Sequence, residues 1–304
     1  MPTVSIVMPA YNAGTYVAES MRSVVAQTMA DWELLVVDDG SSDDTCEVVG
    51  GFLSDPRIRL LKQENAGPAA ARNRGIREGI GPFVAFLDSD DLWVPEKLAR
   101  QQEEFRIHPE IALCATGMKV IGPDGAVRGE TLGPDRCGQA LPDLLAGKFD
   151  VLLSSAMVRR EVLDRAGLFD ESIRLSEDFE LWLRVALQGP FRMLAEPLLL
   201  YRSGHGNISG TAGDKRRDYV LEVIVPKFMG LPGAAAHVRP KHVRALRSLC
   251  FKNRADEQTS WGSAIHWYVR AILCRPSALD AWRALASRMV PRFLVRGVKA
   301  ILRR

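Results

Sequence analysis

Residues 83–91 have the sequence Phe-Val-Ala-Phe-Leu-Asp-Ser-Asp-Asp. Five consecutive apolar residues predict a strand that is buried on both faces of a sheet. Three carboxylates, those of Asp88, Asp90 and Asp91, follow this strand directly. Carboxylates this close together repel one another unless a cation screens them, and Mg²⁺ or Mn²⁺ prefers such oxygen ligands. The alternative is an acidic turn in which Asp91 caps the next helix.

The surrounding residues predict alternating strands and helices. We expect strands at residues 4–8 (ended by Pro9), 32–37, 57–62 and 83–87, and helices at 16–27, 43–53 and 68–79. This order predicts a parallel sheet with helices on both faces, in which ligands bind beyond the carboxyl ends of the strands. Two strands end in acids, one of them before Asp38 and Asp39, so we expect a site at that edge. The chain has neither a G-x-G-x-x-G sequence after its first strand nor a Walker lysine loop, which argues against dinucleotide binding and P-loop phosphoryl transfer.

The next hundred residues predict shorter elements, and the alternation stops beyond Gly210. We expect a hairpin turn at 122–125, an apolar strand at 152–158, helices at 160–166 and 179–187, and a strand at 197–201 that ends in a polar loop. From there to the end the sequence predicts helices. We therefore expect a catalytic domain at 1–210 and a basic, mainly helical extension at 211–304.

Composition indicates an ordinary globular protein without a membrane span. Of the 304 residues, 47% are hydrophobic and 25% charged. The five cysteines form no C-x-x-C pair, which indicates free thiols in a reducing compartment. The N-terminal residues lack the basic start and long apolar core of a signal peptide, and no window approaches eighteen consecutive apolar residues. We expect a cytoplasmic location.

The net charge of +3 conceals a strong asymmetry. Residues 239–304 carry 15 Lys and Arg and 3 acids, a net of +12, whereas residues 1–238 carry 25 bases and 34 acids, a net of −9. Residues 288–304 predict a cationic amphipathic helix, the pattern of a segment that lies on an anionic membrane surface. The alternative is a helix whose apolar face packs on its own protein. No motif supports nucleic-acid binding.

An ordered series of motifs carries a family resemblance. The motifs are V-S-I-V-M-P-A-Y-N (4–12), V-D-D-G-S (37–41), N-A-G-P with A-R-N (65–73), D-S-D-D (88–91) and E-D before L-W (177–182). The series resembles the family 2 inverting glycosyltransferases with the GT-A fold, a Rossmann-like, mostly parallel sheet with helices on both faces. The resemblance covers roughly residues 1–210.

The resemblance implies a donor site for a nucleotide-diphospho-sugar. Pro9 and Tyr11 match positions that line the base pocket, although Tyr11 could instead pack on the core of a structural turn. Asp39 matches a carboxylate that accepts a hydrogen bond from uracil. The alternative for residues 38–41 is a turn that caps the next helix, and one of the pair Asp38 and Asp39 is expected to serve that structural role. Arg72 is expected near the base or the diphosphate, with a surface arginine as the alternative.

The resemblance also implies the chemistry. Asp88, Ser89 and Asp90 make up the D-x-D element, in which Asp90 ligates Mg²⁺ or Mn²⁺ and Asp88 faces the ribose or sugar. Asp178 matches the general base that deprotonates the acceptor hydroxyl. Further metal contacts are expected from Asp88 and from His205 in the loop after the last strand; a solvent-exposed loop histidine is the alternative.

We therefore expect an enzyme that transfers one sugar from a UDP- or dTDP-sugar to a hydroxyl acceptor with inversion. The acceptor is expected to be a glycan or a lipid-linked molecule in cell-surface polysaccharide or glycoconjugate synthesis. The basic extension adds the expectation of a peripheral location on the cytoplasmic face of the membrane. The alternatives are a catalytically inactive sugar-nucleotide-binding or scaffold protein and a nucleotidyltransferase.

Overall fold

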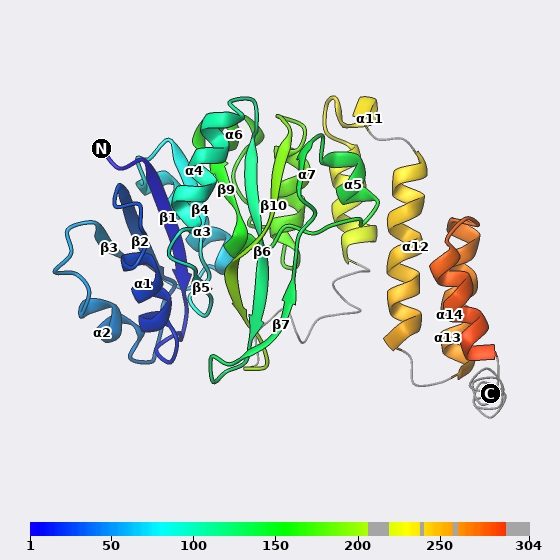
Figure 1. Cartoon of the computed structure of the whole chain (residues 1–304), viewed down its shortest axis with the longest axis horizontal. Coiled ribbons are helices and arrows are strands. Elements are labelled where there is room, and N and C mark those ends of the chain that lie inside the picture. The colour runs from blue at the N-terminus through cyan, green and yellow to red at the C-terminus, as the bar shows by residue number, and fades with distance from the viewer. Residues whose placement is uncertain (206–218, 238–239, 258–260, 290–304) are drawn as a thin grey trace, which may run out of the picture. The chain divides into compact units, whose positions relative to one another are not determined.

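The computed structural model describes residues 1–205, 219–237, 240–257 and 261–289 (Figure 1). The strands are β1 (Val4–Ala10), β2 (Trp32–Asp38), β3 (Ile58–Lys62), β4 (Phe83–Phe86), β5 (Leu92–Trp93), β6 (Leu113–Ile121), β7 (Val127–Thr131), β8 (Arg136–Gly138), β9 (Met157–Arg159) and β10 (Phe191–Arg202). The helices up to residue 185 are α1 (Val17–Val25), α2 (Thr45–Gly50), α3 (Pro68–Glu78), α4 (Lys97–Ile107), α5 (Leu141–Leu145), α6 (Arg160–Ala166) and α7 (Glu177–Val185), with the 3₁₀ turn η1 (Leu153–Ser155).

The strands form one mixed sheet in the order β3-β2-β1-β4-β9-β6-β10-β5. Strand β9 pairs antiparallel with both β4 and β6, and β6 pairs parallel with β10. Of the described strands, β3, β2, β1, β4, β6 and β10 therefore run in one direction, and their carboxyl ends meet at one edge. The predicted α/β sheet is confirmed.

Helices cover both faces of the sheet because its central strands are apolar on both sides. Ile6 and Met8 of β1 share a core with Met21 of α1 and Leu98 of α4. Val7 faces the other way, against α3: a Cβ added at Gly75 would lie 2.5 Å from Val7 Cγ1, so only glycine lets α3 approach so closely.

Two details of the predicted elements, and the alternative role for Asp91, are wrong. Pro9 does not end the first strand, because β1 continues to Ala10 and pairs with β2 up to Asp38. Asp91 does not cap a helix, because β5 follows it and α4 begins only at Lys97. The last strand is also longer than expected and begins at Phe191.

By its internal contacts the chain divides into two compact units, residues 1–141 with 149–213 and residues 142–148 with 214–304. The second unit contains η2 (Val220–Ile224), α10 (Val225–Met229), α11 (Ala234–His237), α12 (Pro240–Glu257), α13 (Trp261–Cys274) and α14 (Leu279–Met289). Small side chains such as Ala264 and Ala271, together with Tyr268, fill the core of its last three helices. Among the described residues, no helix is both long and apolar enough to cross a membrane. The amphipathic helix predicted at 288–304 lies outside the described residues beyond Met289.

Helix α4 buries a lysine side chain completely. Lys97 is fully inaccessible; its Nζ donates to Gln101 Oε1 at 2.7 Å and lies 4.1 Å from the centre of the Trp93 ring. No carboxylate of the described residues forms an ion pair with it. Burial lowers the pKa of Lys97 to about 7.

This lysine predicts a pH dependence of stability. In the unfolded chain its pKa is about 10.4, so between pH 7 and 10 the unfolded state binds more protons than the folded state, and the free energy of unfolding rises by up to about 1.4 kcal/mol per pH unit. We expect Lys97→Met to remove this rise and to stabilise the protein near pH 7. Urea unfolding followed by tryptophan fluorescence at pH 7 and 9 measures both effects. The control Lys148→Met changes a side chain that is 64% exposed and should keep the wild-type slope; equal slopes in Lys97→Met and wild type would contradict the prediction.

Candidate active site

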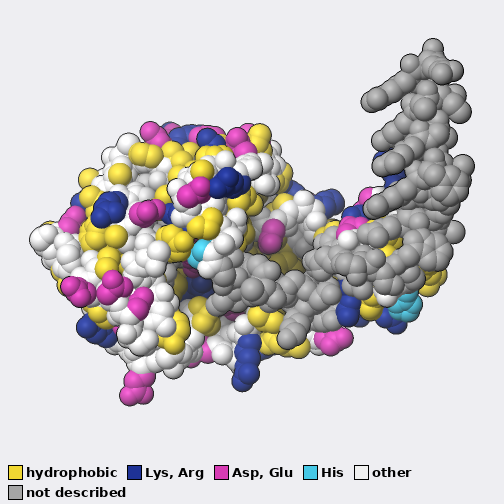
Figure 2. Space-filling view, turned by 90° about the horizontal axis from the view of Figure 1, so that it is seen from below, with side chains coloured by type: hydrophobic (Ala, Val, Ile, Leu, Met, Phe, Trp, Pro, Cys, Tyr) yellow, Lys and Arg dark blue, Asp and Glu magenta, His cyan; other side chains and the backbone are white. Residues whose placement is uncertain are grey.

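The carboxyl edge of the sheet brings the predicted site residues together. Ala10 at the end of β1 pairs with Asp38 of β2, and on the other side of β1 the amide N–H of Leu87 donates to Val7 O at 3.1 Å. The residues that follow β1, β2 and β4 therefore lie side by side. Figure 2 looks onto this edge and shows a hollow with charged side chains inside it.

The turn at residues 88–91 is held in place from three sides. Its own backbone closes through Asp91 N–H to Asp88 O at 3.1 Å. The Asp88 N–H donates to Ser154 Oγ at 3.1 Å, and Ser20 Oγ of α1 donates to Ser89 O at 2.8 Å. Ser154 precedes the reversed strand β9, which is why a residue so distant in sequence lies at this edge.

Asp90 and His205 face each other at this edge. His205 Nε2 lies 2.7 Å from Asp90 Oδ2, and the imidazole packs edge-on against Tyr16 at a centroid distance of 5.0 Å. Burial, and next the charge of Asp88, raise the pKa of Asp90, against the lowering effect of His205. The other ring nitrogen, Nδ1, is buried and has no hydrogen-bond partner among the described residues. The structure thus brings together Asp90 and His205, two of the three residues that were predicted as metal ligands, although they lie 115 residues apart in the sequence.

Arg202, at the end of β10, fixes the backbone around Asp90. Its side chain is 1% exposed; Nε donates to Asp90 O at 2.9 Å and Nη2 to Glu19 Oε2 at 2.6 Å. Its backbone N–H donates to Asp91 Oδ1 at 2.9 Å. Burial, and next the charges of Asp90 and Asp88, raise the pKa of Asp91 well above its usual range. Asp91 therefore belongs to the support of the site. The sequence analysis did not identify Arg202. An arginine at the end of an otherwise apolar strand was the feature that could have indicated it.

Arg72 links the D-x-D turn to the start of α7. Nη2 donates to Asp88 Oδ1 at 2.9 Å and Nη1 to Glu177 Oε1 at 2.8 Å, while the guanidinium lies 5.6 Å from the Phe169 ring centre. Burial acts to lower the pKa of Arg72, but the charges of Asp88 and Glu177 raise it overall. The surface-arginine alternative is wrong, because the residue is 6% exposed. A contact with a donor stays a prediction.

Asp178 lies in the first turn of α7, half-buried beside this ion pair. The helix begins at Glu177, two residues earlier than predicted, after Ser176 in the left-handed conformation at φ +58°. Asp178 Oδ1 accepts a hydrogen bond from the Phe179 N–H at 2.8 Å. Its charge also contributes to the raised pKa of Arg72. The carboxylate predicted as the base and the D-x-D turn are therefore connected through one arginine.

The two aspartates after β2 differ in their contacts. Asp39 is buried and anchors the loop before α3: Oδ1 accepts from Gln63 Nε2 at 2.7 Å and from Ala66 N–H at 2.9 Å, and Oδ2 accepts from Gly67 N–H at 2.8 Å. Oδ1 of the buried Asp38 has no hydrogen-bond partner among the described residues.

Pro9 and Tyr11 lie at the end of β1, and Tyr11 is 54% exposed. The alternative of a core-packed Tyr11 is therefore wrong. Its ring is accessible at the edge where the resemblance implies a base pocket, and contact with a nucleotide base stays a prediction.

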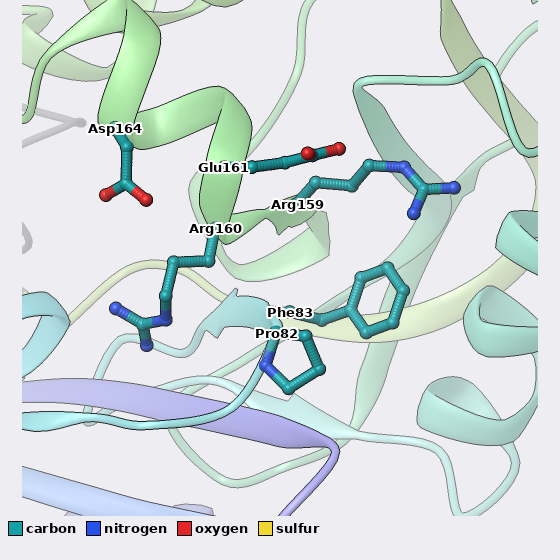
Figure 3. Close-up of a pocket in the computed structure, with 6 residues that line it drawn as sticks. All are labelled: Pro82, Phe83, Arg159, Arg160, Glu161 and Asp164. Carbon is teal, nitrogen blue, oxygen red and sulfur yellow. The ribbon is translucent and has the colours of Figure 1, made fainter.

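A separate pocket lies at the opposite end of β4. It has a volume of about 320 Å³ and is lined by Pro82, Phe83, Arg159, Arg160, Glu161 and Asp164 (Figure 3). Both arginines use their N–H groups within the protein: Arg160 donates to Gly81 O and Ile76 O, and Arg159 to Ile111 O. Arg159 and Arg160 therefore stabilise the backbone at the amino edge of the sheet, away from the acidic turn at residues 88–91.

Comparison with known proteins gives a match to one family sequence model and to individual proteins. A sequence model described as glycosyl transferase family 2 matches residues 5–167. The chain is 37% identical over 185 residues to the Escherichia coli protein named UDP-Glc:alpha-D-GlcNAc-diphosphoundecaprenol beta-1,3-glucosyltransferase WfgD, a match that covers 60% of this chain and 69% of that protein. It is 33% identical over 193 residues to the Bacillus subtilis glycosyltransferase TuaG, whose name refers to teichuronic acid biosynthesis; the match covers 62% of this chain and 73% of TuaG. An uncharacterized glycosyltransferase of Rickettsia felis is 34% identical over 183 residues, which cover 60% of this chain and only 30% of that longer protein.

Two solved structures share the fold. One is S. aureus TarS 1–349 in complex with UDP-GlcNAc, with a TM-score of 0.68 and 19% identity over 92% of this chain and 83% of that chain. The other is the mannosyltransferase PcManGT from Pyrobaculum calidifontis in complex with GDP-Man and Mn²⁺, with a TM-score of 0.56 and 18% identity over 94% of this chain and 84% of that chain. Together with the match to the family sequence model, they confirm the predicted GT-A architecture.

The buried Arg202 carries a prediction about stability. Arg202→Met leaves the carbonyls of Asp90 and Pro123 without the donor that Arg202 supplies, whereas Gly122 O still accepts from the Gly125 N–H. Since each buried unsatisfied acceptor costs about 1–3 kcal/mol, we expect a loss of at least about 2 kcal/mol in the free energy of unfolding. Urea unfolding measures it. The control Arg128→Met removes a pair that is 58% exposed on both sides and should change stability by less than about 0.5 kcal/mol. Similar small losses in both variants would contradict the structural role of Arg202.

Proposed function

The chain belongs to glycosyl transferase family 2, and we propose that it transfers one sugar from a UDP- or dTDP-sugar to a hydroxyl acceptor with inversion. The catalytic domain is residues 1–210. The observation that carries the proposal is the convergence of Asp88, Asp90 and the Glu177–Asp178 helix start at one edge, linked by the buried Arg72. This arrangement places a donor-binding turn and a candidate base next to each other.

The residues at this edge fit a divalent cation. Asp90 and His205 supply an oxygen and a nitrogen that face each other, and Asp88 adds a neighbouring carboxylate. Burial, and next the charge of Asp88, raise the pKa of Asp90. Mg²⁺ or Mn²⁺ held by Asp90, Asp88 and His205 would neutralise charge on the diphosphate of the donor. The Mn²⁺ in the complex of the P. calidifontis mannosyltransferase supports this choice.

Asp178 is the proposed general base. Its half-buried carboxylate lies in the first turn of α7, where the positive end of the helix dipole and the nearby charge of Arg72 interact favourably with a negative group. It would accept the proton of the acceptor hydroxyl as the oxygen attacks the anomeric carbon. One base suffices because the departing diphosphate needs no proton. Attack opposite the diphosphate inverts the anomeric centre.

Tyr11, Pro9 and Asp39 are the proposed base-recognition residues. Oδ2 of Asp39 accepts one hydrogen bond from the described residues, so a lone pair is left for the imide N–H of uracil or thymine. A carboxylate at the position of Asp39 disfavours any base that would place a hydrogen-bond acceptor, in place of the imide N–H, opposite it. The exposed ring of Tyr11 can stack on the face of the base.

The relatives support a uracil nucleotide and a lipid-linked acceptor. The name of the E. coli relative specifies UDP-Glc as donor and a diphosphoundecaprenol-linked sugar as acceptor, and TarS was solved with UDP-GlcNAc. We propose a role in cell-surface polysaccharide or glycoconjugate synthesis, at the cytoplasmic face of the membrane. The charge of +12 in residues 239–304 supports contact with anionic lipid. The exposed apolar side chains Leu273, Leu279 and Trp282 on α13 and α14 support it as well.

Calorimetry with UDP-, dTDP-, GDP- and CMP-sugars, with and without Mn²⁺, tests the donor and the cation. We expect Mn²⁺-dependent binding of a uracil or thymine nucleotide that is lost in Asp90→Ala. Asp178→Asn should keep donor binding but slow transfer about 10²–10⁴-fold, the usual contribution of a general base. Asp164→Asn, which alters a carboxylate at the amino edge, is the matched control and should keep both. Binding without any transfer would favour an inactive binding protein, and an unchanged transfer rate in Asp178→Asn would reject Asp178 as the general base.

Flotation with liposomes tests the membrane contact. We expect the full chain to bind vesicles of anionic lipid, to lose binding when residues 288–304 are deleted, and to bind neutral vesicles poorly. High salt should weaken the interaction because it screens the charges. Undiminished flotation of the deletion variant would reject the role of this segment.

A further inference from the structure

A group of three possible metal ligands lies on the catalytic unit away from the donor site. His108, Glu110 and Cys137 each place one ligand atom within 4.8 Å of the others. His108 and Glu110 follow α4 and precede β6, whereas Cys137 is the middle residue of β8 and pairs with Arg192 near the start of β10. The group therefore lies at the amino ends of β6 and β10, at the opposite edge from Asp90.

The donor atoms suit zinc better than magnesium or manganese. A thiolate, an imidazole and a carboxylate are the three side-chain types that bind Zn²⁺, whereas Mg²⁺ avoids sulfur. His108 Nδ1 lies 3.6 Å from Glu110 Oε1. Zinc bond lengths of about 2.0–2.3 Å at tetrahedral angles require ligand atoms about 3.3–3.7 Å apart, so the group needs to contract by about 1 Å at most. Glu110 and Cys137 are exposed and can make that adjustment by side-chain rotation.

The second imidazole nitrogen has an orienting carboxylate. His108 Nε2 lies 3.9 Å from Glu104 Oε2, and the Glu104 side chain is only 7% exposed. Arg192 Nε donates to that same oxygen at 2.8 Å and holds it in place. At 3.9 Å this is an ion-pair distance, longer than a hydrogen bond. A metal-bound histidine usually donates its other N–H to a carboxylate, and Glu104 is the buried carboxylate beside Nε2 that could take this part. This contact is independent of the cluster itself and leaves Nδ1 to face Glu110 and Cys137.

We propose that His108, Glu110 and Cys137 bind Zn²⁺, with Glu104 as the residue that positions His108. Three protein ligands leave a fourth position for water. The ion links the loop after α4 to β8, a strand of three residues that pairs with the start of β10. Its role is to stabilise this edge of the sheet, separately from the donor chemistry.

Cobalt spectroscopy on the metal-free full chain tests the proposal without measuring activity. CoCl₂ should produce the near-ultraviolet charge-transfer band of a thiolate–cobalt bond together with strong visible bands of tetrahedral Co²⁺, and ZnCl₂ should abolish both. The donor site cannot produce the thiolate band, because the residues proposed there are carboxylates and a histidine. Asp90→Ala should therefore keep the band, which separates this inference from the proposed function.

The variants decide which residues hold the ion. Cys137→Ser should lose the charge-transfer band, whereas the control Cys274→Ser, at a half-exposed thiol of α13, should keep it. His108→Gln should weaken Zn²⁺ binding at least tenfold, and Glu104→Gln about 10–100-fold, as is usual for an orienting carboxylate. A band that persists in Cys137→Ser, or no band in the wild type, would overturn the proposal.

Discussion

Repulsion among the carboxylates at the carboxyl edge of the sheet is the constraint on which the rest of the site depends. Four carboxylates, those of Asp88, Asp90, Asp91 and Glu177, converge at the end of β4 and the start of α7, and burial raises the cost of their charges. Two buried arginines offset it. Arg72 lies between Asp88 and Glu177, and Arg202 lies beneath the Asp90–Asp91 backbone. Removing either arginine would destabilise the protein by several kcal/mol, because it would leave buried negative charge at this edge without its compensating cation.

The reversed strand β9 explains how the edge is assembled. Because it runs against β4, its amino end lies where β4 ends, and Ser154 just before it accepts the Asp88 N–H. Its carboxyl end leads into α6 at the opposite edge. The chain then returns through residues 167–176 so that α7 begins beside Arg72. A fully parallel order would place neither Ser154 nor Glu177 there.

Buried and accessible groups at this edge divide the work between support and chemistry. Asp91, Arg72 and Arg202 are nearly inaccessible and form hydrogen bonds within the protein, although Nε of Arg72 has no partner among the described residues. Asp88, Asp90 and Asp178 are half-buried, and Tyr11 is exposed, so these side chains can meet a ligand. The amino edge shows the same division, with Arg159, Arg160 and Glu104 engaged inside and Cys137 and Glu110 accessible.

The sequence alone determined the elements and the chemical character of this protein. Apolar periodicity and Gly and Pro positions act over a few residues, so the strands 4–10 and 83–86 and the acids that follow them could be predicted within a few positions. The ordered motifs indicated the family. Tertiary structure decided which of these side chains meet: Arg72 with Glu177 across 105 residues and His205 with Asp90 across 115. It also decided that Asp91 and Arg202 are support and that Asp39 anchors a loop. Such pairings depend on strand order and on the burial of each charge, and both result from long-range packing that no local pattern contains.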